Sequence, residues 1–141
     1  MKAFLDTSVL VAAVRETDLR HEVSRSLWMH FNSQNAGCAA HSLAELYASL
    51  TAMRPPNRFR PEQAMLVLDQ VKGSLRCIAL SAEEVFQTVR QIAALKLPGG
   101  IVYDALLMAC ARKVDAERIY TWNEKHFRMV APDLADRIIT P

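Results

Sequence analysis

The stretch KAFLDTS at residues 2–8 decides the fold that this sequence predicts. Its first half is a short apolar run typical of a buried strand, and its second half consists of residues that begin helices. Similar apolar runs recur at residues 37–40, 75–80 and 118–121, and Ile138-Ile139 adds one near the end. Helical patterns separate these runs, which predicts right-handed crossovers between parallel strands. We therefore expect an α/β protein with a short parallel sheet of four or five strands, flanked by helices on both faces.

Helices are expected between these strands, over residues 9–14, 21–34, 42–53, 62–71, 81–95 and 103–114. The proline-rich segment 54–61 interrupts the helical pattern, Gly73 is expected to end the helix before it, and Pro98-Gly99-Gly100 is a further break. Residues 123–127 are expected to form a polar turn. The core is expected to include large residues at helical spacing on apolar faces, namely Trp28, Phe31, Met65 and Met108.

The composition is that of an ordinary globular domain, with 51% hydrophobic residues, 23% charged residues and a formal net charge of +2. A length of 141 residues is a common domain size, so we expect residues 1–141 to form one domain. The three cysteines are widely spaced and contain no CxxC pair, which argues against a zinc site or a disulfide framework. No apolar stretch reaches the ~18 residues of a membrane span, and Asp6 interrupts the N-terminal run, so a cytoplasmic protein is expected.

Three acids and one amide lie where such a sheet would bring them to one edge. Asp6 follows the first strand, Asn123 follows the strand at 118–121, and Glu45 and Asp104 lie in the first turns of largely apolar helices. Ligands of parallel sheets bind beyond the carboxyl ends of the strands. Clustered carboxylates repel one another and favour a cation, and oxygen ligands without sulfur or paired histidines favour Mg²⁺ or Mn²⁺.

Each of these residues also has an ordinary structural interpretation. Asp6 can cap the helix that follows it, and Ser42-Leu43-Ala44-Glu45 has the pattern of a capping box, in which the glutamate returns to its own helix start. Asp104 in a first helical turn favours the helix dipole, and Asn123 after a strand is typical of a turn. The argument for chemistry rests on all four occurring in one chain.

The ordered set resembles the PIN-domain family, and within it the VapC toxins of bacterial type II toxin–antitoxin pairs. The matching stretches are FLDTSVL at residues 4–10, SLAEL at 42–46, YDALLMA at 103–109 and TWNEKHF at 121–127. Their order and spacing agree with the family over essentially the whole chain. The resemblance implies a PIN-like α/β sandwich and a Mg²⁺- or Mn²⁺-dependent ribonuclease.

The same resemblance gives each acid a role. Asp6, Glu45 and Asp104 match the family's invariant acids, with Asp6 and Asp104 as metal ligands and Glu45 as a further ligand or as the group that orients the attacking water. Many relatives carry Asp where this chain has Asn123, and the lost charge argues against tight binding of a second metal. The Asn123 amide would hold metal-bound waters or substrate. Nearby hydroxyls that could support the site are those of Thr7, Ser8 and Thr121.

RNA phosphates need cations outside this acidic site. One candidate group is Arg54, Arg58 and Arg60, which flank Phe59 in a segment without acids. A second is Lys125 and Arg128, which lie beside Asn123. His126 and Phe127 belong to the family motif, and we expect a structural role for the pair. The other histidines show no metal spacing and are interpreted as surface or packing residues (His21, His30 and His41).

The resemblance also implies partners: an RNA substrate, either tRNA or ribosomal RNA, a VapB-like antitoxin, and a second copy in a homodimer. Cleavage of such RNA would inhibit translation. Two alternatives remain open at the level of sequence. One is a PIN nuclease that processes RNA without an antitoxin, and the other is a binding module with little activity, which Asn123 makes conceivable.

Overall fold

A five-stranded parallel sheet forms the centre of the computed structural model, which describes all 141 residues. The sheet has the order β3-β2-β1-β4-β5. Its strands are β1 (Ala3–Leu5), β2 (Ala36–Ala39), β3 (Arg76–Ile78), β4 (Arg118–Tyr120) and β5 (Ile138–Ile139). The expected α/β fold with a short parallel sheet is therefore confirmed. Every strand has only two to four residues, so the carboxyl ends of the strands lie close to the middle of the sheet.

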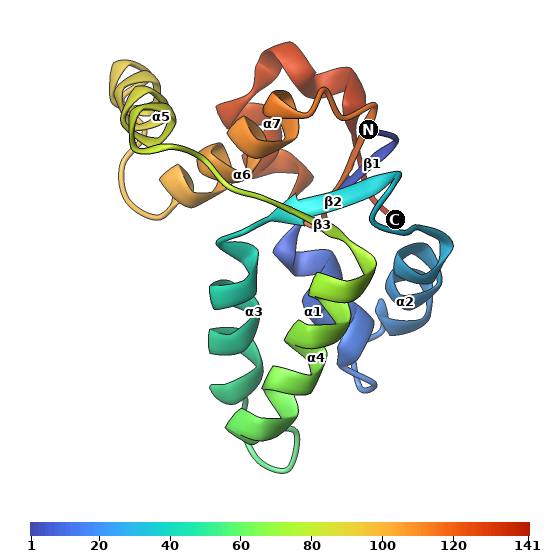
Figure 1. The fold of residues 1–141 in the computed structure, drawn as a ribbon. Helices are drawn as coiled ribbons and strands as arrows, with labels where there is room; N and C mark the ends of the chain where they lie inside the picture. The colour runs from blue at the N-terminus through green and yellow to red at the C-terminus, as the bar shows by residue number, and fades with distance from the viewer.

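Helices cover both faces of this sheet (Figure 1). The helices are α1 (Thr7–Val14), α2 (His21–His30), α3 (Ser42–Thr51), α4 (Pro61–Ser74), α5 (Ala82–Ala94), α6 (Ile101–Lys113) and α7 (Glu124–Val130), and a 3₁₀ helix spans Pro132–Arg137. The first four lie on one face, whereas α6 and α7 lie on the other, and α5 stands out to one side against α6 (Figure 1). None of the helices is long and apolar enough to cross a membrane.

The side chains of alternate strand residues pack into two separate hydrophobic cores, one on each face of the sheet. Ala3 and Leu5 of β1 pack with α1, α3 and α4, whereas Phe4 packs with α6 and α7 on the opposite face. Burial on both faces explains why these strands read as continuous apolar runs instead of alternating patterns. Trp28 and Met108 are buried in these cores as expected.

Several sequence-based boundaries and core assignments were wrong. Residues 124–130 form the helix α7 instead of a polar turn, because a seven-residue segment is too short to show helical periodicity. Gly73 lies inside α4, which ends at Ser74. Met65 is 48% exposed, since α4 buries a stripe through Ala64, Val67 and Val71 that does not include it. The helix α2 ends at His30, and the Phe31 that follows it is only partly buried.

The expected capping box at residues 81–84 is present at the start of α5. Ser81 Oγ accepts a hydrogen bond from the Glu84 backbone N–H at 3.2 Å, and Glu84 Oε2 accepts one from the Ser81 N–H at 2.6 Å. Lys113 of α6 donates to the same carboxylate oxygen at 2.8 Å. These contacts fix the start of α5 against α6, although the outer face of α5 leaves Phe86 and Val89 exposed.

Candidate active site

The charge of Asp6 acts on the ionisation of the other two acids of the sequence motif. Burial, followed by the charge of Asp6 and then that of Glu45, raises the pKa of Asp104 to about 6. The pKa of Glu45 is also raised, mainly by burial and in smaller part by the charge of Asp6. Because these effects require short separations, the structure brings the three acids from β1, α3 and α6 to one place.

Asp6 is the most buried member, with only 4% of its surface exposed. It occupies the N-cap position of α1, but its side chain makes no capping bond to the helix backbone. Instead, its Oδ2 accepts hydrogen bonds from Ser8 Oγ at 2.6 Å and from Thr121 Oγ1 at 2.7 Å. Burial raises the pKa of this carboxyl group, and the two hydroxyl bonds oppose the rise. The capping interpretation of Asp6 is therefore wrong.

Both hydroxyls are oriented by neighbouring backbone groups. The N–H of Trp122 donates to Ser8 Oγ at 3.0 Å, and the N–H of Asn123 donates to Thr121 Oγ1 at 2.9 Å. Since a hydroxyl carries one hydrogen, each oxygen that accepts these bonds directs its own proton to Asp6. Oδ2 is thus occupied twice, and Oδ1 is the oxygen of Asp6 left without a side-chain hydrogen bond.

Glu45 does not close a capping box. The helix α3 begins at Ser42, with His41 at its N-cap position, so Glu45 is the fourth helical residue. Ser42 is fully buried, and its Oγ accepts a hydrogen bond from Thr7 Oγ1 at 2.9 Å. The Glu45 carboxylate lies 3.4 Å from His41 Nε2 and is 40% exposed. The glutamate is therefore free to serve the acidic cluster that it faces.

Asp104 reaches the cluster from the first turn of α6 and has His126 as its neighbour. His126 Nδ1 lies 3.6 Å from Asp104 Oδ2, and the imidazole is 58% exposed. Phe127, the next residue, is completely buried in the core on the α6–α7 face. The motif therefore separates two roles that sequence reasoning had joined: Phe127 anchors α7, and His126 faces the site.

Asn123 is the N-cap residue of α7, next to Thr121, the residue that binds Asp6. Its backbone is tied to Thr121, whereas its exposed side chain makes no hydrogen bond. It lines a hollow together with Lys125, His126 and Arg128. Lys125 is exposed, but Arg128 is engaged by Glu124 at 2.7 Å and by the Ile138 carbonyl at 3.2 Å. Of the two basic residues expected beside Asn123, Lys125 is the one without such a contact.

The arginines of the other expected RNA-binding group lie away from the acids. Arg54, Arg58 and Arg60 are exposed in the segment between α3 and α4, at the end of α3 opposite to Glu45 (Figure 1). A ten-residue helix is ~15 Å long, so one helix length separates them from the site. Arg58 Nε also donates to the Met53 carbonyl at 2.9 Å. The structure does not bring this group together with the acidic cluster.

The donor set suits a hard cation that retains water. No three acidic, histidine or cysteine side chains converge closely enough to form a complete metal cage. Mg²⁺ dehydrates reluctantly and is commonly held by one or two carboxylates together with waters. Asp6 Oδ1, which accepts no side-chain hydrogen bond, and the carboxylate of Asp104 supply oxygens of this kind, and the charge of Glu45 also acts on Asp104. The residues fit a water-mediated Mg²⁺ or Mn²⁺ site better than a closed one.

Known proteins with the same fold resemble this chain over most of its length. Ribonuclease VapC27 of Mycobacterium tuberculosis is 31% identical over 114 residues, which cover 80% of this chain and 79% of that protein. The solved structure of the M. tuberculosis toxin VapC20, which cleaves the sarcin-ricin loop, has a TM-score of 0.71 at 20% identity and covers 89% of this chain and 92% of its own.

The VapBC-1 structure from nontypeable Haemophilus influenzae gives a TM-score of 0.67 at 15% identity, with coverage of 99% of this chain and 98% of its own. At these identities the solved structures support the fold. The PIN domain pattern itself matches residues 3–131 and thus includes all the acids of the site. This chain belongs to the PIN domain family.

Proposed function

We propose that this protein is a Mg²⁺- or Mn²⁺-dependent endoribonuclease that acts as the toxin of a VapBC-type pair. One observation carries the proposal: Asp6 lies at the carboxyl end of β1, its charge raises the pKa of both Glu45 and Asp104, and the charge of Glu45 adds to the rise at Asp104. Such repulsion is relieved by a cation. Membership of the PIN family and the similarity to a VapC ribonuclease support hydrolysis of RNA as the reaction.

Each polar residue then has a defined task. A bound Mg²⁺ or Mn²⁺ would polarise the phosphoryl oxygen and lower the pKa of an attacking water. Asp6 would bind it through Oδ1, because Oδ2 is held by Ser8 and Thr121. Asp104 would supply a second ligand oxygen, either directly or through a water.

The remaining two motif residues act at the edge of this centre. Glu45 is partly exposed and would orient the attacking water or hold a metal-bound water. Asn123 presents a neutral amide, which can hold a water or a phosphate oxygen without adding charge. Lys125 is the cation best placed to meet a phosphate beside the site, and Arg54, Arg58 and Arg60 would contact RNA at a distance of one helix length.

The partners follow from the comparisons and from the chemistry. The similar structure VapBC-1 is a toxin–antitoxin pair, and we infer a VapB-like antitoxin and a homodimer for this chain as well. The substrate would be tRNA or ribosomal RNA, and its cleavage would stop translation. An antitoxin that placed a cation against Asp6, Glu45 and Asp104 would neutralise the site.

Purified protein incubated with total cellular RNA tests the nuclease directly. Discrete RNA fragments should form in Mg²⁺ or Mn²⁺, should not form in chelator, and should disappear in Asp104→Asn. Asp115→Asn is a matched control, since Asp115 is exposed and paired with Arg137 away from the acids. Binding of RNA without cleavage by the wild type would favour the alternative of a weak RNA-binding module.

Induction in bacterial cells tests the toxin assignment. Wild-type protein should arrest growth and Asp104→Asn should not, and sequencing of RNA 5′ ends after induction should show one dominant cleavage site. Equal growth of the two strains, with cleavage intact in the purified protein, would favour an RNA-processing nuclease without an antitoxin.

A further inference from the structure

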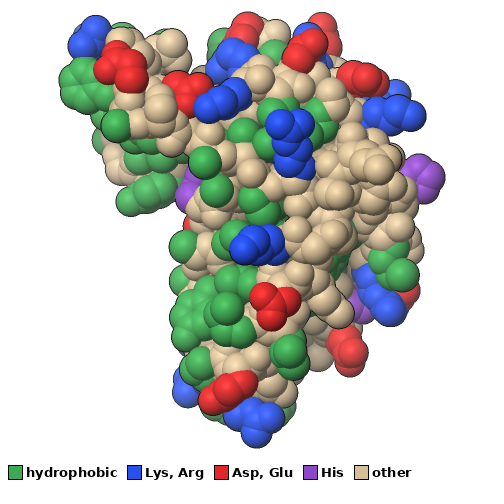
Figure 2. Space-filling view, in the orientation of Figure 1, with side chains coloured by type: hydrophobic (Ala, Val, Ile, Leu, Met, Phe, Trp, Pro, Cys, Tyr) green, Lys and Arg blue, Asp and Glu red, His purple; other side chains and the backbone are tan.

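A small apolar recess lies directly beside the acidic cluster. Its volume is about 270 Å³, and its lining includes Ala40, Leu80, Val85 and Leu106 together with Tyr103 and His41. It lies where the start of α3, the segment after β3 and the first turns of α5 and α6 meet. In Figure 2 the surface is indented on this side of the molecule, below the projecting α5.

Two residues make the recess continuous with the candidate active site. Tyr103 immediately precedes Asp104 on α6, and His41 Nε2 lies 3.4 Å from Glu45 Oε1. A molecule bound in the recess would therefore touch residues adjacent to two of the three acids. If a phosphodiester were held at the acids, one of its flanking nucleosides would therefore lie next to the recess.

The two ring residues are available for a ligand. Tyr103 is a large aromatic residue in the first turn of α6, and 59% of its surface is exposed. The His41 side chain is 31% exposed, although its Nε2 is shielded from solvent and faces Glu45 Oε1 at 3.4 Å. Exposed aromatic and imidazole rings are the surfaces on which proteins stack unpaired bases.

We propose that this recess binds one nucleobase of single-stranded RNA next to the scissile phosphate, stacked against Tyr103 and His41. The inference rests on the proposed function, because it takes RNA as the ligand. The acids repel phosphate, so uncharged contacts beside them would add binding energy, and the lining of the recess contains no carboxylate. The volume of about 270 Å³ is just below the ~300–1,000 Å³ of pockets for drug-sized ligands, which suits a single flat group.

Binding in chelator separates this proposal from catalysis. A fluorescently labelled eight-nucleotide single-stranded RNA and an abasic strand of equal length are titrated with wild-type protein, and anisotropy gives both dissociation constants. The base-bearing strand should bind roughly tenfold tighter or more, as expected for stacked bases. Tyr103→Leu should reduce this ratio severalfold, whereas Tyr103→Phe, which keeps the ring, should preserve it.

Two further variants guard against indirect effects. Val85→Phe fills the recess from α5 and should reduce the ratio without weakening abasic binding. Phe86→Ala removes an exposed aromatic that does not line the recess and should leave the ratio unchanged. An unchanged ratio in both Tyr103→Leu and Val85→Phe would overturn the proposal and would favour an apolar side chain of a protein partner as the occupant. Metal-dependent cleavage by the wild type is scored separately and tests only the proposed function.

Discussion

Thr121 and Asp6 are 115 residues apart in the sequence, and Thr121 Oγ1 donates a 2.7 Å hydrogen bond to Asp6 Oδ2. The bond joins the ends of β4 and β1, which are neighbours in the sheet. It also favours the ionised form of a buried carboxyl group whose pKa is raised by burial. The Thr121 hydroxyl thus both connects two neighbouring strands and favours the charged form of Asp6.

Thr121→Val should therefore affect stability and metal binding together. The valine has the same shape but removes one of the two hydroxyl bonds to the buried Asp6 carboxylate, at a cost of ~1–3 kcal/mol in the free energy of unfolding. Chemical denaturation measures this loss, and the Mg²⁺ concentration for half-maximal cleavage should rise. Thr121→Ser retains the hydroxyl and should restore most of both properties. A valine variant with normal metal dependence would show that the bond serves stability alone.

Replacement of Asp104 by Asn should stabilise the metal-free protein at neutral pH. The folded pKa of Asp104 is raised from 3.8 to about 6, so the folded state binds more protons than the unfolded state between these values. Stability that depends on this group is present below pH 4 and is lost as the pH rises to 6. The gain from Asp104→Asn should be absent at pH 3.5 and should reach up to about 3 kcal/mol above pH 6.

Denaturation of both proteins at several pH values in chelator measures this difference. Groups whose pKa is lowered, such as Asp18 and Asp115, are the same in both proteins and cancel. A gain that is independent of pH would mean that the substitution acts through packing.

Mg²⁺ or Mn²⁺ should raise the melting temperature by binding the folded state. The increase follows mass action and should be modest, because Asn123 leaves the site with three carboxylates. It should vanish in Asp6→Asn, since the buried carboxylate is the proposed anchor of the ion. Calorimetry over a range of metal concentrations provides the measurement. A similar increase in Asp6→Asn would place the ion elsewhere on the protein.

Glu45→Gln and Glu84→Gln compare a candidate catalytic glutamate with a capping one. Glutamine is accepted in a capping box, so Glu84→Gln should leave RNA cleavage intact and cost only the ion pair with Lys113. Glu45 makes no capping bond, and its replacement removes a charge from the acidic cluster. Cleavage by Glu45→Gln should fall by about two orders of magnitude or more while the fold is retained. Equal activity of the two variants would remove Glu45 from the site.

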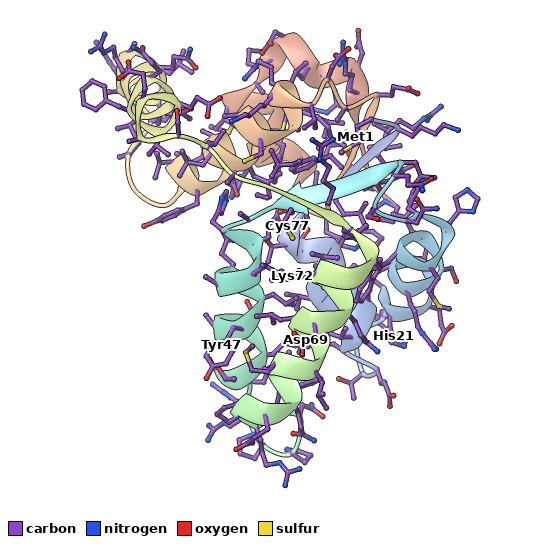
Figure 3. All side chains as sticks on the ribbon, in the orientation of Figure 1. Met1, His21, Tyr47, Asp69, Lys72 and Cys77 are labelled. Carbon is purple, nitrogen blue, oxygen red and sulfur yellow. The ribbon has the colours of Figure 1, made fainter.

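Cys77 should be the first thiol to react with an alkylating reagent. Cys38 and Cys77 are opposite each other on β2 and β3 with their sulfurs 4.0 Å apart, and the contact with Cys38 lowers the pKa of Cys77 to about 7. Lys72 lies beside Cys77 and acts in the same direction (Figure 3). Cys38 and Cys110 are buried, and burial raises the pKa of Cys110 to about 11.

Iodoacetamide labelling of native protein, followed by peptide mass mapping, should modify Cys77 with a rate that rises through pH 7. Cys77→Ser should remove the fast phase. Simultaneous labelling of all three thiols would indicate reaction from the unfolded state instead.

Most of the fold was predictable because its strands are apolar runs bounded by residues with strong local preferences. The capping box predicted at Ser81 is present in the structure. The same sequence pattern at Ser42 does not form a capping box, and the reason lies outside the local sequence. Ser42 Oγ accepts a hydrogen bond from Thr7 of α1, which is 35 residues away in the sequence, and no local pattern indicates this contact. The exposure of Met65 depends in the same way on where α3 lies against α4.

The acids of the site were predictable, but their immediate surroundings were only partly so. Asp6, Glu45 and Asp104 were indicated by strand ends, first turns and the family motifs, and the structure brings them together. The sequence did not indicate that His126 faces Asp104 or that Tyr103 remains exposed beside it. Such orientations are set by the packing of α6 and α7, which depends on residues far apart in the chain.

The order of the strands also has a consequence for the time at which the protein acquires its site during synthesis. β1 is made first, but its place in the sheet is between β2 and β4, and β4 is nearly the last strand to leave the ribosome. Until residue 121 has been made, one edge of β1 is unpaired and Asp6 lacks its hydrogen bond from Thr121. During most of translation the nascent chain thus carries Asp6 and Glu45 without β4, the strand whose end supplies the Thr121 bond to Asp6.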